Sequence, residues 1–362
     1  RDSRWPRGHY VGRLGKAGDV ATETAILLEE RDVATAQFSP HVLACLPPPK
    51  KEYAFHADDK RLDLRSLTVC SIDPPNCRDV DDALSCQVVS ENVLEVGVHI
   101  ADVTHFCASG SPLDDEARQR GTSTYLVDRR LDMLPKRLTE ELCSLRANVE
   151  RYAFSVLVRL HADTGEIVSS PKFAKSIIKS NAALTYHEAQ LMLNDDADQS
   201  AVASTVRRLA TMARRLRKNR FLKGALTLAS PEVKFELSSS NGESDSPTDV
   251  ASYELVEANA TVEEFMLLAN VEVAKKILAT YPGLALLRNH PEPPRDKFAP
   301  LLEKARVSCS LTIDPSSNKA LAKSLDEASN SVKHDPYLDR LLRIVATRCM
   351  APARYFCAPD GA

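Results

Sequence analysis

The sequence predicts an α+β fold, with a mixed sheet in the first half of the chain and helices in the second half. Between residues 67 and 170, short runs alternate apolar with polar residues, which is the period of half-buried strands. After Thr185, apolar residues recur every three or four positions, as in an amphipathic helix. A chain of 362 residues with 43% hydrophobic content is long enough to enclose cores in more than one domain.

The start of the chain reads as a short β-rich segment over residues 5–33. Glycines at 12, 15 and 18 read as turns between apolar stretches such as Ala25–Leu28. They do not form the G-x-G-x-x-G pattern of a dinucleotide site. The proline- and lysine-rich residues 46–51 predict a linker that ends the first domain.

Three alternating runs form the expected start of the sheet, at residues 67–73, 83–89 and 94–102. A polar turn joins the last two and indicates a hairpin. Residues 153–160 and 166–170 predict a further hairpin, because Asp163, Thr164 and Gly165 between them have the chemistry of a tight turn.

The expected helices begin with Thr185, which is followed three residues later by Glu188 in a capping-box pattern. The clearest helical period covers residues 254–280, and a last helix is expected from about Tyr337 to Phe356. The polar residues 238–249 predict a surface loop.

A strongly basic helix is expected between Arg207 and Lys223, where eight basic residues and no acidic residue occur. A solvated charged face is the ordinary interpretation of such a helix, and phosphate binding is the alternative. The net charge of −3 gives no global electrostatic attraction for nucleic acid, so an RNA site must be a local patch.

The nine cysteines include no C-x-x-C pair and read as reduced thiols of an intracellular protein. No apolar run approaches the roughly 20 residues of a membrane span, so we expect no membrane partner. The chain does not begin with Met and reads as an excerpt from a longer protein.

The chemistry of the chain is concentrated in residues 71–85, SIDPPNCRDVDDALS, where Asp73 ends an apolar strand and Asp79, Asp81 and Asp82 follow. Like charges about 4 Å apart repel by roughly 4 kcal/mol per pair at an effective dielectric of 20. Hard divalent cations are the natural partners of such a cluster. In an extended stretch Asp79 and Asp81 face one side and Asp82 the other, so one ion cannot use all four. Two ions about 3.5–4 Å apart could share them, an arrangement suited to phosphodiester hydrolysis.

Two other interpretations of the acidic cluster remain open from the residues alone. One is a solvated acidic turn. The other is a calcium loop, which fits poorly because Leu84 stands at the sixth position from Asp79, where such a loop has glycine.

A series of blocks, in order along the chain, resembles the catalytic domain of the RNase II and RNase R exoribonucleases. The blocks are IDPPNCRDVDDAL, VGVHIADVTHF, LDDEARQRGTSTYLVDRRLDMLP, RLTEELCSLRANVERYAFSV, GALTLASPEV and VEEFMLLAN. Within the family, the stretches VEEFMLLANVEVAKKI, LLRNHPEPP and TRCM-x-x-A-x-YFC are most similar to the catalytic exoribonuclease subunit of the eukaryotic RNA exosome. The opening WPRGHYVGRLGKAGD resembles the last strands of a cold-shock OB-type barrel.

This resemblance implies three parts of the chain: the end of an OB-type barrel at 1–45, a linker at 46–65 and a catalytic domain at 66–362, truncated at its C-terminal end. It implies a processive hydrolytic 3′→5′ exoribonuclease that degrades single-stranded RNA to nucleoside 5′-monophosphates, with Mg²⁺ or alternatively Mn²⁺ as cofactor. Exosome core subunits are the implied partners, in RNA processing and decay. The implied location is the nucleus, with its nucleolus, and the cytoplasm in addition. The alternative is a catalytically silent RNA-binding or scaffold subunit of the same fold, because the family's T-S-P-I-R block is absent.

Carried over by position, the resemblance makes Asp73, Asp79, Asp81 and Asp82 the magnesium-binding and catalytic carboxylates. Loss of Asp81 is expected to be the most damaging.

Three further residues are implied in substrate binding. Tyr125 matches the aromatic residue that stacks on the 3′-terminal base, and a half-buried structural tyrosine is the alternative. Glu263 matches a glutamate near the end of the substrate, although without the resemblance Glu263 and Glu264 read as an exposed pair on a helix. Phe235 matches the second half of an aromatic clamp. By contrast, we interpret His99 and Asp102 of the HIAD block as structural polar groups.

Overall fold

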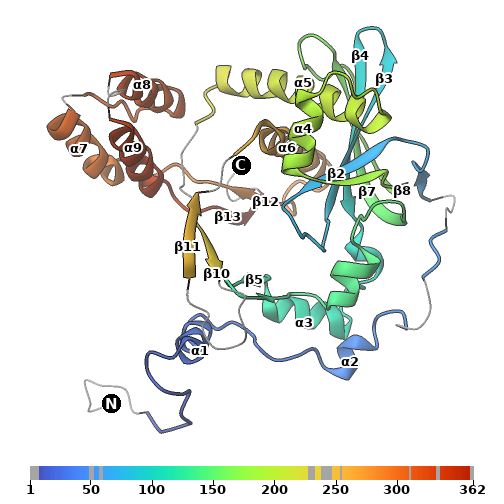
Figure 1. Cartoon of the computed structure of the whole chain (residues 1–362), viewed down its shortest axis with the longest axis horizontal. Coiled ribbons are helices and arrows are strands. Elements are labelled where there is room, and N and C mark those ends of the chain that lie inside the picture. Colours follow the sequence, from blue (N-terminus) through green and yellow to red (C-terminus); the bar gives the residue numbers. More distant parts are fainter. Residues whose placement is uncertain are drawn as a thin grey trace. The chain divides into compact units, whose positions relative to one another are not determined.

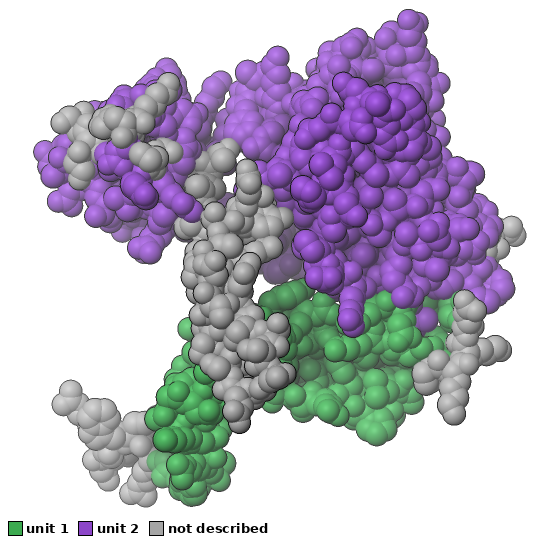
Figure 2. All heavy atoms as spheres, in the orientation of Figure 1, with its two compact units in different colours: residues 1–53, 103–141, 233–251 green, residues 54–102, 142–232, 252–362 purple. Residues whose placement is uncertain are grey.

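The computed structural model describes residues 8–48, 53–56, 60–226, 255–309, 311–331 and 335–358, together with the backbone of residues 233–237 and 247–252. The chain separates into two compact units (Figures 1 and 2). The first unit contains residues 1–53, 103–141 and 233–251, and the second contains residues 54–102, 142–232 and 252–362.

The second unit is built on a seven-stranded sheet in the order β1-β8-β7-β4-β3-β2-β9. Its strands are β1 (Leu62–Asp63), β2 (Val69–Asp73), β3 (Asp82–Ser90), β4 (Val93–Ala101), β7 (Glu150–His161), β8 (Lys172–Lys179) and β9 (Ala182–Thr185). The pairs β1–β8 and β2–β9 are parallel and the others antiparallel, so the predicted mixed sheet is confirmed.

The first predicted hairpin is confirmed, because β3 and β4 pair from Asp82 with Ile100 to Ser90 with Val93, with one shift of register between Val88 and Ser90. The second is only partly right. The turn is present, with Gly165 at a φ of 71°, but its second arm makes a single bridge between Leu160 and Ile167. Pro171, which has no N–H for a strand ladder, then leads into β8, and β8 is the long partner of β7.

Three helices cover one face of this sheet: α4 (Tyr186–Asn194), α5 (Ala201–Leu222) and α6 (Glu257–Thr280) (Figure 1). The capping box of Thr185 and Glu188 is present at the start of α4, and α6 covers the predicted helical period, so both predictions are confirmed. Leu209, Met212 and Phe265 are fully buried against the strands. Burial of one such side chain contributes about 1.5–3 kcal/mol, so this apolar face holds the helices on the sheet.

A smaller helical group follows, with its own core. It consists of a 3₁₀ turn at Arg295–Phe298, α7 (Ala299–Cys309), α8 (Asn318–Ser331) and α9 (Pro336–Cys349). Strands β12 (Leu286–Asn289) and β13 (Arg354–Cys357) pair beside it. The predicted last helix is therefore wrong in its end, because Pro352 cannot continue a helix and the chain turns into β13.

The first unit contains short elements. They are α1 (Val20–Glu30), α2 (Pro40–Leu43), a 3₁₀ turn at Val103–His105, α3 (Pro112–Arg120), β5 (Thr124–Tyr125), β6 (Arg130–Leu131), a helical turn at Arg137–Leu142, β10 (Val233–Leu237) and β11 (Pro247–Ser252). Most of the predicted loop at 238–249 lies outside the described residues, and its last three residues belong to β11.

The β-rich interpretation of residues 5–33 is wrong for the part that the structure describes, because α1 occupies its second half. Asp19 caps this helix by accepting a hydrogen bond from the Thr22 backbone N–H at 3.1 Å, and Glu23 accepts one from the Gly18 N–H at 2.8 Å. This reciprocal capping, followed by good helix formers, outweighs the alternation of apolar residues. Among the described helices, none is both long and apolar enough to span a bilayer.

Candidate active site

The acidic residues lie where β2 and β3 separate. The two strands pair only at Val69 with Ser85 and at Cys70 with Leu84. Beyond this short ladder, Asp73 ends β2 and Asp82 begins β3. The connecting loop is anchored by its backbone, since the Ala101 N–H donates to the Asp81 carbonyl at 2.9 Å. The fold therefore fixes all three backbone positions from which the carboxylates project.

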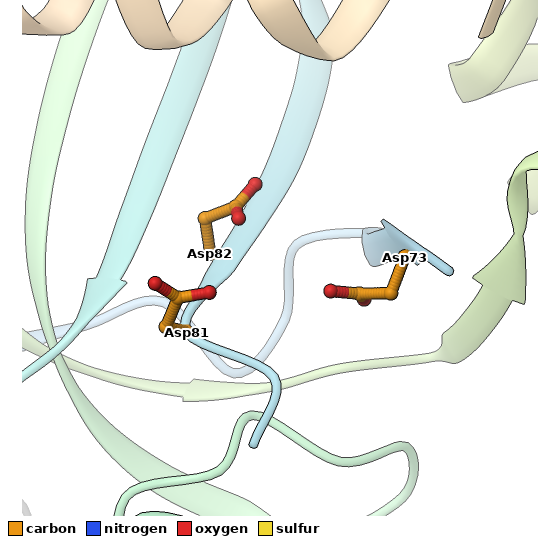
Figure 3. Close-up of side chains that lie close together, drawn as sticks. All are labelled: Asp73, Asp81 and Asp82. Atoms are coloured by element: carbon orange, nitrogen blue, oxygen red, sulfur yellow. The ribbon is translucent and has the colours of Figure 1, made fainter. Parts of the chain in front are cut away.

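Asp73, Asp81 and Asp82 point toward one another (Figure 3), with one carboxylate oxygen of each within 4.8 Å of the others. This corrects the alternation argument, which separated Asp81 from Asp82. Asp81 precedes the regular strand, where the two-residue period does not apply. Asp79 is outside this group, and one of its carboxylate oxygens lies 3.8 Å from the Cys77 Sγ.

Burial and mutual repulsion disfavour the charged forms of these carboxylates. Burial raises the pKa of Asp82 to about 7, with the charges of Asp81 and Asp73 adding to the shift. Burial, and then the Asp81 charge, raises the pKa of Asp73 to about 6. The pKa of Asp81 is raised by the surrounding protein and then by Asp79, although Asp81 is the most exposed of the three. A bound cation would relieve these costs.

The group fits a hard divalent cation such as Mg²⁺ or Mn²⁺. Its three members offer only carboxylate oxygens. One of them, Asp73 Oδ2, is buried and makes no hydrogen bond of ordinary geometry in the described chain, although Ser71 is close enough to act against the rise in the pKa of Asp73. Such an orphaned oxygen is unexpected in a solvated acidic turn but suits a metal ligand. The nearby Cys77 does not belong to the group, and hard divalent cations prefer carboxylate oxygen to sulfur. The absence of Asp79 from the group also disfavours a calcium loop that starts there.

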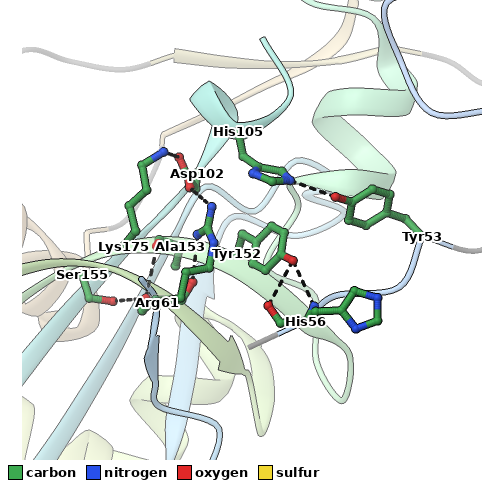
Figure 4. A network of polar contacts seen from close by, with 10 residues as sticks. Tyr53, His56, Arg61, Asp102, His105, Tyr152, Ala153, Ser155 and Lys175 are labelled. Carbon is green, nitrogen blue, oxygen red and sulfur yellow. Dashed lines mark hydrogen bonds and ion pairs between the residues drawn. The ribbon is translucent and has the colours of Figure 1, made fainter. Parts of the chain in front are cut away.

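His99 and Asp102 are buried, hydrogen-bonded groups, in agreement with the structural role predicted for them. The His99 ring nitrogens lie 2.9 Å from Ser85 Oγ and 2.7 Å from Ser155 Oγ. Asp102 accepts from Arg61 at 2.8 Å and from Lys175 at 3.2 Å (Figure 4).

The cationic partners of Asp102 were missed from the sequence. Arg61 also lies over the Tyr152 ring, 3.9 Å from its centroid, and the Tyr152 hydroxyl accepts from the His56 N–H at 2.9 Å (Figure 4). These contacts hold His56 and Arg61 against the sheet. No local pattern could have revealed them, because the partners are 41 to 96 residues apart in the sequence.

Glu263 is the predicted substrate-binding residue of the second unit. The contacts within this unit do not place it at the acidic group. Glu263 lies 3.4 Å from Arg220 and 4.0 Å from Arg217 on α5. The same part of α5 contacts the turn after β7, through Arg215 and Asp163. By contrast, Asp82 pairs with Ile100 of β4, which in turn pairs with the first half of β7.

The expected exposed pair on this helix is only half right. Glu263 is exposed, but the Glu264 side chain is 3% exposed and accepts from Arg220 at 2.6 Å. The helix turns Glu264 toward α5, and the paired guanidinium offsets the cost of burying the carboxylate.

Tyr125 and Phe235 belong to the first unit. Tyr125 lies on β5 and is 72% exposed, so the half-buried alternative is wrong and its ring is available for stacking. Phe235 lies on β10, and its side chain is outside the described residues.

The basic helix α5 is held by the protein over most of its length. Five of its six arginines contact carboxylates or backbone carbonyls. They are Arg207, Arg214, Arg215, Arg217 and Arg220. Most of the arginine charge therefore serves packing. Among the described contacts, Arg208 and Lys218 are the basic residues of this helix without a polar partner.

The sheet thus brings together three carboxylates in an arrangement that could hold a hard cation. Comparison with known families identifies the chain more closely. Residues 61–361 match the RNB domain, and residues 1–32 match the Dis3-like cold-shock domain 2. The chain belongs to the RNB domain family. The second match agrees with an OB-type fragment at the start, although its described part contains the helix α1.

Curated relatives extend well beyond this chain. The exosome complex exonuclease RRP44 homolog A of Arabidopsis thaliana is 52% identical over 364 residues, which are 99% of this chain and 38% of the relative. The human exosome complex exonuclease RRP44 is 47% identical over 360 residues, which are 99% of this chain and 36% of the relative. The chain thus spans less than two fifths of either protein.

Solved structures support the fold. Mycoplasma genitalium RNase R in complex with ribose-methylated single-stranded RNA superposes with a TM-score of 0.83 at 22% identity, over 96% of this chain and 53% of that one. Yeast Ssd1, described as a pseudonuclease, superposes with a TM-score of 0.75 at 21% identity, over 97% of this chain and 42% of that one. The mixed α+β fold is confirmed, and the second likeness means that the fold alone does not establish activity.

Proposed function

We propose that this protein is a processive hydrolytic 3′→5′ exoribonuclease that degrades single-stranded RNA to nucleoside 5′-monophosphates within an exosome-type complex. The observation that carries this proposal is the group of Asp73, Asp81 and Asp82 with its orphaned buried oxygen. Relatives named exosome complex exonucleases support the choice of reaction and partner.

Asp73, Asp81 and Asp82 would hold Mg²⁺ or Mn²⁺, with Asp79 completing a two-ion site. Divalent ions bound there supply an activated water and offset the charge on the departing 3′-oxygen. The half-buried Asp73 and Asp82 fix the position of the site, because their strands are anchored in the sheet. Asp81 is exposed and is the carboxylate best placed to face a substrate.

The remaining predicted residues bind RNA in this proposal. The exposed ring of Tyr125 stacks on the 3′-terminal base, a contact that contributes roughly 1–3 kcal/mol without selecting a sequence. Phe235 provides the opposite half of the clamp. Glu263 contacts the end of the substrate after its carboxylate leaves Arg220, a weak exposed pair that costs little to break.

The proposal includes exosome core subunits as partners and the nucleus, nucleolus and cytoplasm as locations, with roles in rRNA processing and RNA decay. Purification of the tagged full-length protein from its own cells tests the partner. Recovery without exosome core subunits would contradict that part of the proposal and leave the nuclease chemistry untouched.

A catalytically silent RNA-binding subunit is the second candidate, because a pseudonuclease has the same fold. Asp81→Asn in the full-length protein separates the two. The change is nearly isosteric but removes one metal-binding charge, so we expect nucleotide release to fall at least about a hundredfold, or roughly 2.7 kcal/mol of transition-state stabilisation. RNA affinity should persist, since phosphate contacts and stacking lie elsewhere.

The matched control is Asp163→Asn, which changes an exposed aspartate outside the group. It should leave nucleotide release, RNA affinity and Tm unchanged. A parent protein without nucleotide release would support the silent subunit. Release by Asp81→Asn within a few-fold of the parent would remove Asp81 from catalysis, and joint loss of folding and binding would indicate a structural acidic turn.

A further inference from the structure

A polar pocket of about 470 Å³ lies in the second unit at the other end of the β2–β3 ladder. The chain before Val69 diverges from β3 beyond Ser85, and the first turns of α5 border the resulting space. Ser85 is three residues from Asp82 along β3, and Thr68, which directly precedes β2, is five residues from Asp73. At about 3.3 Å per residue the pocket is roughly 10–16 Å from the acidic group, so it is a separate site.

The lining of this pocket suits an anion. Its polar groups include the Arg208 guanidinium and the hydroxyls of Ser66, Thr68, Ser85, Ser204 and Thr205. None of the lining residues is acidic. Hydroxyl donors around a guanidinium are the groups that bind phosphate oxygens.

Arg208 is the arginine of α5 that no described protein group neutralises, whereas the other five have partners within the fold. The hydroxyls of Ser66, Thr68 and Ser204 likewise have no partner in the described chain. The pocket therefore presents a cation and hydroxyl donors that are free to bind a ligand.

The Arg208 charge reaches the pocket wall. Burial raises the pKa of the Cys86 thiol to about 11, and Arg208 is the nearby charge that acts against this shift. Cys86 itself lines the pocket, so the charge of Arg208 acts electrostatically on a residue of the pocket wall. The pocket also lies at the positive end of a 22-residue helix, which adds to the attraction for an anion.

We propose that the pocket around Arg208 binds a phosphate group, carried either by an RNA strand or by a free nucleotide. The binding of phosphate does not depend on the proposed nuclease activity. Only the identification of RNA or a released 5′-mononucleotide as the carrier rests on the proposed function.

The test compares Arg208→Gln with Lys218→Gln. Lys218 is a matched control because it is an exposed cation of the same helix, has no described partner and does not line the pocket. Neither change removes a protein contact, so both variants should fold with the parent's Tm. Binding of inorganic phosphate and of adenosine 5′-monophosphate is measured by calorimetry in chelator, which removes any contribution of ions at the aspartates.

Arg208→Gln should weaken phosphate binding roughly tenfold or more, the effect expected for loss of a hydrogen bond to a charged group, while Lys218→Gln leaves it unchanged. Parent-like phosphate and nucleotide binding by Arg208→Gln, with an unchanged RNA salt slope, would overturn the proposal.

A second measurement identifies the carrier. Binding of a single-stranded oligoadenylate is followed against salt in the Asp81→Asn background, where the RNA should remain intact. If RNA is the carrier, Arg208→Gln reduces the slope of log affinity against log salt by about 0.7, one phosphate contact. If only free-phosphate binding is lost, a small nucleotide is the ligand and RNA is excluded.

Discussion

Acidification should destabilise the protein through His99, because no charged group of the described residues bonds to the ring and stabilises its protonated form. The ring is fully buried between Ser85 and Ser155, and burial lowers its pKa from 6.5 to about 4. Gly97 allows this packing, since a Cβ there would lie 2.4 Å from Ser85 Oγ and 2.6 Å from His99 Nε2.

The direction of the change in stability with pH follows from the lowered pKa of the His99 imidazole. Above pH 6.5 neither the folded nor the unfolded chain protonates this histidine, and its contribution to stability is fully present. Between pH 6.5 and about 4 the unfolded chain binds a proton that the folded chain excludes, so stability is lost as the pH falls. At 1.36 kcal/mol per pKa unit the full loss is about 3 kcal/mol, of which about 2 kcal/mol falls between pH 8 and pH 5.

Urea denaturation of the parent and of His99→Gln at pH 8, 7, 6 and 5 measures this contribution. Other groups titrate in both proteins, so the informative quantity is the difference between their free energies of unfolding. His99→Gln should be less stable than the parent at pH 8. The difference between their free energies of unfolding should be smaller by about 2 kcal/mol at pH 5. The control is His187→Gln, which alters an exposed histidine. Its free energy of unfolding should differ from that of the parent by nearly the same amount at each pH. Parallel pH profiles for the parent and His99→Gln would refute the burial of a neutral imidazole.

Three further predictions concern the site and its frame. Exhaustive chelation should stop nucleotide release and added Mg²⁺ or Mn²⁺ should restore it, because the acidic group offers only hard oxygen ligands; undiminished release in chelator would exclude a metal-dependent site. Tyr125→Ala should lengthen the final undegraded RNA more than it slows turnover on long substrates, as seen by gel, whereas the control Tyr337→Ala should give the parent's end product. Asp102→Ala should cost about 3–5 kcal/mol of unfolding free energy by stranding Arg61 beside Lys175, and a Tm near the parent's would mean that the ion pair is dispensable.

Much of the sheet could be predicted because its strands follow a simple period. In residues 83–89 and 94–102, successive side chains point to opposite faces of the sheet. One face packs into the core under the helices, and the other faces a smaller core. The same rule failed at Asp81, where a loop precedes β3 and side-chain direction is set by anchoring rather than by pleating. It failed again at α1, where capping by Asp19 outweighs a weak apolar pattern.

The sequence could predict that aspartates form the candidate site, but not which of the aspartates belong to it. Four aspartates within ten residues indicate a cation site, yet the sequence could not show that Asp79 stays outside the group. Nor could it show that Glu264 is buried, because its partner Arg220 is 44 residues away in the sequence. Ion pairs between residues far apart in the sequence produce no local sequence pattern. They also determine which arginines of α5 already have a partner within the protein.

The short ladder between β2 and β3 connects these observations. Two paired positions hold the strands together, while β9 and β4 hold their outer edges along longer registers. At one end of the ladder the strands part, and the carboxylate of Asp73 lies close to those of Asp81 and Asp82, where a cation would offset the repulsion between their charges. At the other end they part again and leave the Arg208 pocket open beside α5. The acidic group and the pocket around Arg208 thus lie at the two ends of one short ladder, where strand pairing is interrupted. A phosphodiester chain needs both kinds of contact, with cations at the bond that is cut and donors at a phosphate some distance away.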